Sequence, residues 1–275
     1  MSPLADATRR LAQVSDTPRL DAELLLAHAL GIDRERLLLD PPAAVPPEFE
    51  RLLARRLAGE PIAYIVGRRA FWTIELTVTP DVLIPRPDSE TLLDAAVKHF
   101  EGTAGPRRIL DLGTGSGALL LAALDQWRQA TGLGIDRSQA VLAVAAANAH
   151  SIAPDRAELR LGDWADGIAE RFDLLLCNPP YVATATTLGP GVAEHEPHDA
   201  LFAGADGLDA LRELAPQVPH LLEPGGLAAI EIAFDHADRA AALFNAEGLS
   251  AKLARDLAGR PRALLLTHAK IAKIY

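Results

Sequence analysis

Cysteine is almost absent from the sequence, which has only Cys177 among its 275 residues. One thiol excludes a framework of disulfides and a metal cluster held by several thiolates, and it is typical of a reducing compartment. No apolar run reaches about 18 residues, the length that a membrane-spanning helix needs. The first residues, MSPLADATRRLAQ, lack the basic and then apolar pattern of a secretion signal. We therefore expect a cytoplasmic protein that does not cross a membrane.

Positive charge is in deficit. Lys and Arg number 27 against 37 Asp and Glu, so the net charge is −10 and the pI is about 5.3. Proteins that grip nucleic-acid phosphates have the opposite balance, so we expect no direct contact with nucleic acid. The basic run ERLLARRLAGEP at 50–61 allows a local patch, but the solvated face of a helix is the simpler interpretation. An apolar content of 49% indicates a globular chain with a sizeable core.

The chain divides into three regions by pattern. Over residues 1–68 apolar residues recur at helical spacing, interrupted by the turn PPAAVPP, which predicts a small helical domain. Residues 69–84, with AFWTIELTVTP, predict a β-hairpin or an extended linker. Over residues 85–275 apolar runs alternate with helical patterns, which predicts an α/β domain with a parallel, doubly wound sheet. Ligands of such sheets bind just beyond the carboxyl ends of the strands.

The first apolar run ends in a glycine-rich loop, ILDLGTGSGALLLA. Its glycines let the backbone approach a ligand, and the following helix offers its N-terminal amides. The loop suits S-adenosylmethionine, but Gly113, Gly115 and Ala118 also match the dinucleotide fingerprint G-x-G-x-x-A, and a structural turn is a third interpretation. The residues expected to bind a cofactor here are Gly113, Thr114, Gly115, Ser116 and Gly117.

The second and third runs end in residues suited to a nucleoside. Asp136 follows Gly117 by about 20 residues, where a carboxylate can accept both ribose hydroxyl hydrogens. Its alternative role is to cap the next helix. Asp163 and Trp164 offer an acceptor and a flat apolar face to an adenine ring, and their alternative is a loop aspartate beside a packed tryptophan.

The fourth run ends in LLLCNPPYVA, residues 174–183. Pro179 and Pro180 remove two backbone donors and fix two φ angles, so the turn is stiff and holds Asn178 and Tyr181 in place. The carboxamide oxygen of Asn178 and a proline carbonyl can each accept one hydrogen of a planar NH2 group, with Tyr181 against its face. This combination resembles the class I methyltransferases that modify planar NH2 groups, in which Asn-Pro-Pro-Tyr binds the substrate.

Longer stretches resemble one family, the release-factor glutamine N5-methyltransferases, or HemK/PrmC-like family. They are DAELLLAHALG, GEPIAYIVGRRAFW, LIPRPDSETLLDAA, EPHDALFAGADGLD, PGGLAAIEIA and DLAGRPRALLL, and the resemblance runs from about residue 5 to about residue 267. It implies a class I (Rossmann-like) methyltransferase sheet, doubly wound, with a small N-terminal helical-bundle domain. It also implies methylation, at N5, of the glutamine in the Gly-Gly-Gln motif of class 1 peptide chain release factors.

The resemblance further implies a role for each motif. The donor is S-adenosyl-L-methionine, the product is S-adenosyl-L-homocysteine, and no metal takes part. The glycine loop would hold the methionine portion, Asp136 the ribose, and Asp163 with Trp164 the adenine. The helical domain would help to dock the release factor, and we expect a monomer. The catalytic, substrate-binding residues would be Asn178, Pro179, Pro180 and Tyr181, and Asn178 would also contact the donor.

One segment departs from the family pattern. The family usually has Glu-Ile-Gly followed two residues later by Gln, whereas this chain has Ala233 and His236 at those positions, so neither family role carries over. The tail HAKIAKIY after Thr267 matches no family role. His195 and His198, in EHEPH, are expected in a surface loop and not at a metal.

Other functions compete with this assignment. A ribosomal-protein glutamine N5-methyltransferase is a close relative, and a nucleic-acid amino-group methyltransferase shares the fold, although the acidic charge disfavours it. A non-catalytic module could keep the donor site, but the intact Asn178–Tyr181 motif argues against it. A nicotinamide oxidoreductase would use the glycine loop but has no need of that motif.

Overall fold

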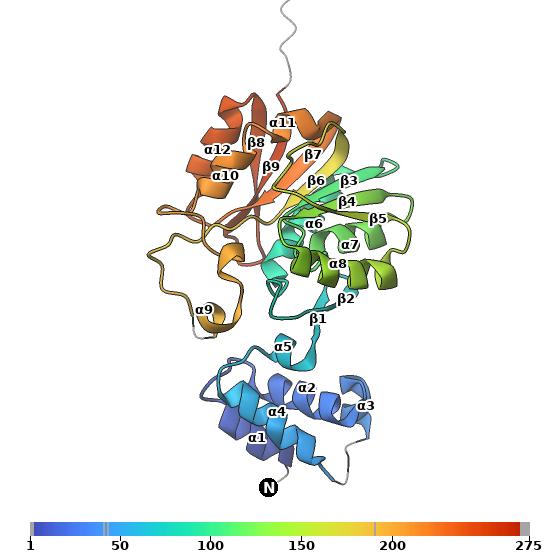
Figure 1. Cartoon of the computed structure of the whole chain (residues 1–275), viewed down its shortest axis with the longest axis vertical. Coiled ribbons are helices and arrows are strands. Elements are labelled where there is room, and N and C mark those ends of the chain that lie inside the picture. The colour runs from blue at the N-terminus through green and yellow to red at the C-terminus, as the bar shows by residue number, and fades with distance from the viewer. Residues whose placement is uncertain (1–2, 41, 43, 190, 270–275) are drawn as a thin grey trace, which may run out of the picture. The chain divides into compact units, whose positions relative to one another are not determined.

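The structure, a computed structural model, describes residues 3–40, 42, 44–189 and 191–269 (Figure 1). The chain falls into two compact units, each of which is described by itself. One takes in the chain up to Arg68 with Val78–Pro80 and Leu188–Glu196, and the other takes in Arg69–Thr77, Asp81–Thr187 and the chain from Pro197 onward.

The first unit is helical. Prolines open α2 and α4, at the position where a helix does not use the backbone N–H. Gly31 ends α2 in the left-handed conformation, with φ 64°. Apolar side chains such as Leu25, Phe49 and Leu53 are fully buried between these helices. The helices are α1 (Pro3–Leu11), α2 (Pro18–Leu30), α3 (Arg34–Leu39), α4 (Pro47–Leu57), α5 (Ile62–Val66) and α9 (Val192–His195).

The helix α9 belongs to this unit although it comes much later in the sequence. Gly191, which precedes α9, has φ 83° and lies so close to Gly59 that a Cβ on it would be 2.7 Å from the Gly59 carbonyl oxygen. Only glycine allows that approach. A close backbone contact of this kind leaves no periodic pattern in the sequence, so it was not predicted.

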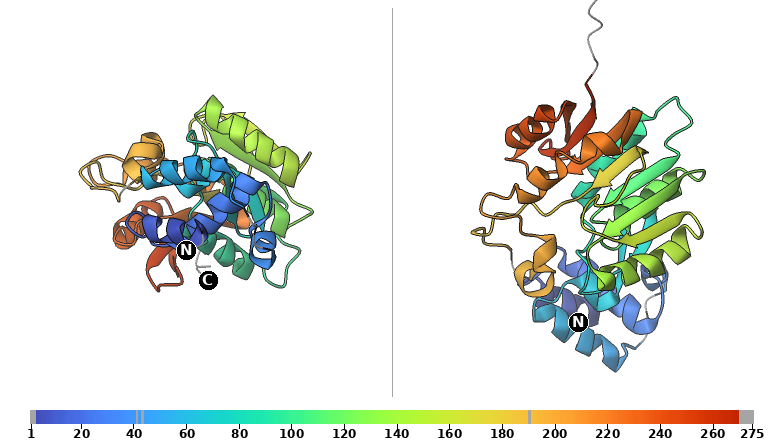
Figure 2. Two further views of the ribbon diagram at one scale, coloured as in Figure 1. Left: turned by 90° about the horizontal axis from the view of Figure 1, so that it is seen from below. Right: turned by 45° about the horizontal axis from the view of Figure 1, so that its top comes forward.

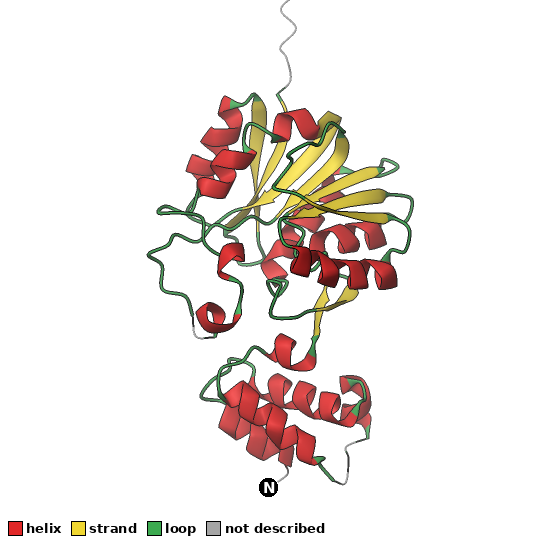
Figure 3. Cartoon of the chain, in the orientation of Figure 1, coloured by secondary structure: helices red, strands yellow, loops and turns green. Residues whose placement is uncertain are grey.

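The second unit is built on a seven-stranded sheet of order β5-β4-β3-β6-β7-β9-β8 (Figures 1 and 3). A separate two-stranded sheet, β1 (Arg68–Phe71) with β2 (Ile74–Thr77), precedes it. The right-hand view of Figure 2 shows the central strands lying side by side. The strands of the large sheet are β3 (Arg108–Leu112), β4 (Thr131–Asp136), β5 (Ala157–Leu161), β6 (Phe172–Cys177), β7 (Leu222–Glu231), β8 (Leu249–Arg255) and β9 (Pro261–His268).

The sheet is parallel from β5 to β7, whereas β9 runs antiparallel to β7 and to β8. The prediction of an entirely parallel sheet is wrong at this edge. A parallel connection needs a crossover of a dozen or more residues, and only a short turn joins β8 to β9. The strand β8 lies at the sheet edge, and after the buried Leu249 all its residues are exposed or half-buried, so it has no apolar run by which to recognise it.

Helices cover both faces of the sheet (Figure 1). On one face, α6 and α7 bury side chains such as Leu92 and Leu120 against Ile109 and Leu176. On the other, α10 to α12 bury Leu211 and Phe244. Because β3, β4 and β6 are parallel, their carboxyl ends lie at the same edge of the sheet. The described helices of this unit are η1 (Pro87–Ser89), α6 (Glu90–His99), α7 (Ala118–Gln126), α8 (Gln139–Ile152), η2 (His198–Ala200), α10 (Asp209–Leu214), α11 (Val218–Leu221) and α12 (Ala237–Ala246).

Candidate active site

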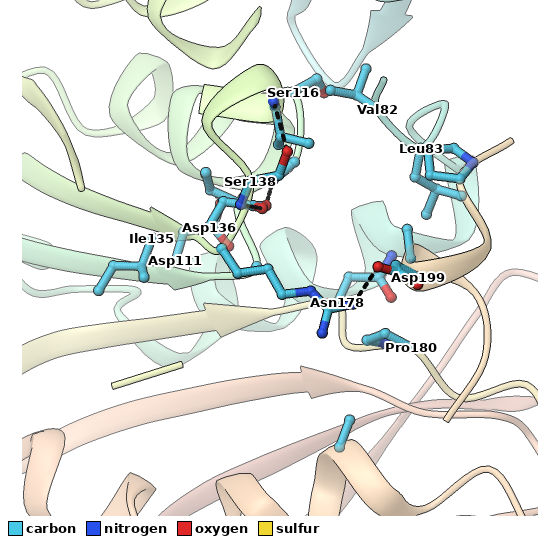
Figure 4. Close-up of a pocket in the computed structure, with 18 of the residues that line it drawn as sticks. Val82, Leu83, Asp111, Ser116, Ile135, Asp136, Ser138, Asn178, Pro180 and Asp199 are labelled. Atoms are coloured by element: carbon cyan, nitrogen blue, oxygen red, sulfur yellow. Dashed lines mark hydrogen bonds and ion pairs between the residues drawn. The ribbon is translucent and has the colours of Figure 1, made fainter. Parts of the chain in front are cut away.

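A cavity of about 650 Å³ lies at the carboxyl ends of β3, β4 and β6, within the second unit. Figure 4 shows Asp111, Asp136 and Ser138 grouped on one side of it, and Asn178, Pro180 and Asp199 grouped on another. Residues singled out from four separate strand ends therefore share one cavity. Those that line it are Gly113, Thr114, Gly115, Ser116, Asp136, Asp163, Trp164, Asn178 and Pro180, whereas Gly117, Pro179 and Tyr181 do not.

The glycine loop joins β3 to α7. Gly113 and Gly115 have φ angles of 70° and 57°, which let the backbone turn along the cavity. Gly117 has φ 85° and precedes α7, where a Cβ would lie 2.9 Å from Cδ1 of Leu121. The left-handed φ of Gly117 strains any other residue there, so this glycine serves the turn into α7 and does not line the cavity.

Asp136 ends β4 and is held by backbone amides. Its Oδ2 accepts from Gly115 N at 3.1 Å and its Oδ1 accepts from Ser138 N at 3.0 Å. The cap of α8 is Ser138, whose Oγ accepts from Val141 N. The alternative that Asp136 caps this helix is therefore wrong. The contacts instead fix a carboxylate at the cavity edge next to the glycine loop.

Trp164 lies over the glycine loop. A Cβ built on Gly113 would meet Cζ3 of the Trp164 ring at 3.6 Å, which is ordinary contact distance. The indole Nε1 donates to Oε2 of Glu213 at 2.8 Å and so fixes the ring. Trp164 also has a φ of 47°, an unusual conformation for a bulky residue. Asp163 precedes it and also lines the cavity. A flat apolar face and a carboxylate thus lie beside the loop.

The Asn178–Tyr181 turn follows β6 directly. Asn178 and Pro180 line the cavity, but Pro179 is buried beneath the turn. The Tyr181 hydroxyl donates to Oε1 of Glu231 at 3.0 Å, so this side chain faces β7. Burial raises the pKa of the Tyr181 phenol, and the nearby Glu231 carboxylate raises it further. In this structure Tyr181 anchors the turn.

Asp111 is a cavity residue that the sequence analysis missed. It is 1% exposed, its Oδ2 accepts from Thr114 Oγ1 at 2.7 Å, and its Oδ1 has no hydrogen-bond partner among the described residues. Burial raises the pKa of this carboxyl to about 7. The available signal was an acidic residue within the apolar run ILDL, because an unpaired buried carboxylate is costly unless a ligand pairs with it.

Ser89 and Glu231 were missed as well, although both lie in quoted segments. Ser89 Oγ donates to Glu231 Oε2 at 2.5 Å, and Asn178 Nδ2 donates to Ser89 Oγ at 3.1 Å. Burial raises the pKa of Glu231, against the effect of hydrogen bonds from Ser89 and Tyr181 and of the charge of Arg262. The signal was again a lone carboxylate ending a buried strand, LAAIE.

The other expectations concern histidines, metals and the chain end. His198 lines the cavity, while His195 lies in α9 of the first unit. Among the described residues no group of three or more His, Cys, Asp or Glu side chains is placed to hold a metal ion. None of the described helices combines the length and the apolar character that crossing a bilayer requires. Most of the tail HAKIAKIY lies outside the described residues, which end at 269.

Comparisons with known proteins indicate the family of the chain. Two family profiles match the chain, one described as PrmC N-terminal domain over residues 3–67 and one as methyltransferase domain over residues 106–249. A Rhodospirillum rubrum protein named release factor glutamine methyltransferase is 44% identical over 258 residues, 91% of this chain and 79% of that protein. A relative of the same name from Cereibacter sphaeroides is 44% identical over 271 residues, 94% of this chain and 96% of that protein.

The chain belongs to the release factor glutamine methyltransferase family. This confirms the resemblance of the sequence to that family and excludes the dinucleotide alternative for the glycine loop. The predicted fold, an α/β methyltransferase sheet with a small N-terminal helical domain, is confirmed too. As a member of this family the chain is a methyltransferase that uses S-adenosylmethionine.

Solved structures share the fold of this family member at low sequence identity. The catalytic domain of hMettl16, solved with a hairpin of the MAT2A 3'UTR, is 13% identical with a TM-score of 0.57, over 80% of this chain and 82% of that chain. A methyltransferase from Pyrococcus furiosus is 19% identical with a TM-score of 0.53, over 80% of this chain and all of that one. At these identities the likeness supports the fold alone.

Proposed function

We propose that this enzyme transfers the methyl group of S-adenosyl-L-methionine to the side-chain amide nitrogen, N5, of the glutamine in the Gly-Gly-Gln motif of class 1 release factors. The observation that carries the proposal is that Asn178, at the end of β6, shares one cavity with the glycine loop and Asp136. An amide acceptor and a donor site in one cavity are what nitrogen methylation requires. The proposed substrate is taken from the name of the relatives, release factor glutamine methyltransferase.

The cavity residues fit the donor. Asp111 has a buried carboxylate oxygen that no described residue hydrogen-bonds, which suits the ammonium of the methionine portion beside the glycine loop. Asp136 would accept from the ribose hydroxyls, and Asp163 and Trp164 would contact the adenine. When bound, the donor supplies an electrophilic methyl group on a positively charged sulfur. The glycine loop residues proposed to hold it are Gly113, Thr114, Gly115, Ser116 and Gly117.

The acceptor is a poor nucleophile, because its nitrogen lone pair is delocalised into the carbonyl. Asn178 Oδ1 and the carbonyl of Pro179 or Pro180 would each accept one N–H of the glutamine amide. These bonds would align the nitrogen for in-line displacement and stabilise the positive charge that grows on it. The proton can leave after methyl transfer, so no general base and no metal is needed. Tyr181 would keep this turn in place through Glu231.

The other parts of the chain follow from this function. We assign residues 1–68 to a domain that docks the release factor, 69–84 to a linking hairpin, and 85–275 to methyl transfer. The net charge of −10 would steer a basic partner that itself binds the ribosome. A release factor is a cytoplasmic protein, so the enzyme would act in the cytoplasm, as a monomer without direct contact with nucleic acid.

The test is incubation with radiolabelled S-adenosylmethionine and a purified, unmodified release factor, followed by mass spectrometry of the Gly-Gly-Gln peptide. We expect one added methyl group on that glutamine. A factor with asparagine in place of the glutamine is the control and should gain none. Donor binding without transfer to the factor would overturn the assignment of the substrate and direct the search to ribosomal-protein glutamines and then to nucleic-acid amino groups.

A further inference from the structure

Three polar side chains form a hydrogen-bonded row that leads from the cavity lining, where Asn178 and Ser89 lie, to Glu231 beyond it. Asn178 Nδ2 lies 3.1 Å from Ser89 Oγ, and Ser89 Oγ lies 2.5 Å from Glu231 Oε2. Ser89 is 3% exposed and Glu231 is fully buried, so water does not compete for these bonds. The three residues come from η1, from the end of β7 and from the turn after β6. Segments far apart in the sequence therefore meet at the amide of Asn178.

The chemistry of this row fixes its direction. A carboxylate only accepts hydrogen bonds, and a serine hydroxyl has one proton to donate. Because the Ser89 proton is directed to Glu231, Ser89 Oγ can only accept from Asn178, and only the amide nitrogen of Asn178 can donate to it. The two ends of a carboxamide have nearly the same size, so packing alone does not distinguish them. The row leaves Oδ1 of Asn178 as the end available to the cavity.

Further contacts hold the carboxylate of Glu231 in place. Its second oxygen, Oε1, accepts from the Tyr181 hydroxyl at 3.0 Å, so both oxygens act as acceptors. Arg262 on β9 forms an ion pair with Asp88 at 2.9 Å, and Asp88 precedes Ser89 in η1. Glu231 thus accepts one hydrogen bond from Ser89 and one from Tyr181. Burial raises the pKa of Glu231, while the two donated hydrogen bonds and the charge of Arg262 favour its carboxylate form, which cannot donate to Ser89 and reverse the row.

We propose that Ser89 and Glu231 are positioning residues for methyl transfer, which orient the Asn178 carboxamide so that Oδ1 faces the methyl-accepting nitrogen. This inference rests on the proposed function, because the acceptor must carry an NH2 group. With the carboxamide reversed, the Asn178 NH2 group would face the NH2 group of the substrate, and two donors do not bond. Ser89 and Glu231 therefore act through Asn178 and do not touch the reacting atoms.

The test uses the full chain with unmodified release factor under saturating donor. We expect Ser89→Ala and Glu231→Gln each to lower kcat by about 10- to 100-fold, the scale of a misplaced reacting group. The Kd for S-adenosylhomocysteine should stay within about twofold, because the donor end of the cavity is unchanged. Ser89→Thr keeps the hydroxyl and should restore kcat to within about threefold. The matched controls are exposed residues, Ser250→Ala and Glu247→Gln, which should leave kcat unchanged.

A double-mutant cycle separates positioning from general support. In the Asn178→Ala background, single-turnover rates should not fall further when Ser89→Ala or Glu231→Gln is added, because the group they orient is gone. Additive losses in that background would overturn the proposal, as would a Ser89→Ala enzyme as fast as wild type. Ser89→Cys, which keeps the volume with a weak donor and acceptor, replaces Ser89→Ala if that variant does not fold.

The wild-type reaction distinguishes failure of the proposed function from failure of the positioning role. Wild-type enzyme that fails to methylate the factor overturns the proposed function and, with it, the acceptor that this inference needs. Wild-type enzyme that methylates the glutamine while Ser89→Ala and Glu231→Gln keep full kcat overturns the positioning role alone.

Discussion

The phenol of Tyr181 donates a hydrogen bond to Oε1 of Glu231 across 3.0 Å, so the last residue of the Asn-Pro-Pro-Tyr motif points towards the sheet and away from the cavity lining. Glu231 is fully buried and ends β7, whereas Tyr181 belongs to the turn after the neighbouring strand β6. The bond therefore ties the turn to the next strand. It gives the tyrosine a structural task that its place in a substrate-binding motif does not reveal.

Tyr181→Phe should destabilise the protein. The substitution removes one of two donors to a buried carboxylate, which costs about 1–3 kcal/mol. We expect a lower denaturant midpoint with an unchanged slope, and donor affinity equal to that of wild type. In a Glu231→Gln background the same substitution should cost less, because no charge remains to be satisfied. An equal cost in both backgrounds would show that the bond contributes nothing specific.

Asn178→Ala should separate chemistry from donor binding. The substitution removes the side-chain acceptor for the glutamine amide but leaves the glycine loop and Asp136 intact. We expect kcat to fall by about 10²- to 10³-fold, as on loss of one group that stabilises a transition state. Calorimetric titration with S-adenosylhomocysteine should give a Kd within a few-fold of wild type. Equal losses in kcat and donor affinity would remove Asn178 from the acceptor site.

Donor binding should depend on pH through Asp111, whose pKa burial raises to about 7. A carboxylate is needed to pair with the donor ammonium, and at pH 6 most Asp111 side chains are protonated. In Asp111→Asn this group does not titrate, so the variant serves as the reference at each pH. Relative to it, the wild type should bind S-adenosylmethionine about tenfold more weakly at pH 6 than at pH 8. Taking the ratio of the two Kd values at each pH cancels the titration of the donor itself. A ratio that does not change with pH would contradict the pairing.

The same raised pKa gives a stability effect of known sign. In the unfolded chain Asp111 titrates near its ordinary value of 3.8, so between about pH 4 and pH 7 the folded protein binds more protons than the unfolded one. Without donor, the free energy of unfolding should therefore fall as the pH rises through this window and level off above about pH 7. Denaturant melts of wild type and Asp111→Asn across the window measure the difference, which should be absent in the variant.

Residues at strand ends were predictable because two local signals coincide there. An apolar run marks each strand, and the first glycine, carboxylate or amide after it marks the ligand edge of a parallel sheet. Gly113, Asp136, Asp163 and Asn178 were found in this way, and the structure brings them to one cavity. The family resemblance then distinguished a methyl donor from a dinucleotide, which the glycine pattern alone leaves open.

Residues that depend on tertiary contacts were not predictable from local pattern. Ser89 lies in the short helix η1, and its partner Glu231 is 142 positions further along the chain. Whether the Tyr181 side chain points into the cavity or towards β7 depends on that same carboxylate. The contact of Gly191 with Gly59 likewise joins two backbone segments that are far apart in the sequence. In each case the sequence shows a plausible polar or small residue but not the residue that it meets.

Buried charge also appears in the first unit, where Arg56 on α4 donates to the nearly buried Asp21 of α2 at 2.8 Å, and to the carbonyls of Val14 and Glu60. Arg56→Met keeps the apolar stem but leaves a buried carboxylate without its cation, so we expect a loss of about 3 kcal/mol in this unit. Adding Asp21→Asn should recover much of it. Hydrogen exchange of α2 and α4 peptides measures the loss locally, with the exposed Arg51→Met as control. If the α2 and α4 peptides exchange at the same rate in Arg56→Met as in Arg51→Met, the Arg56–Asp21 pair does not stabilise this unit.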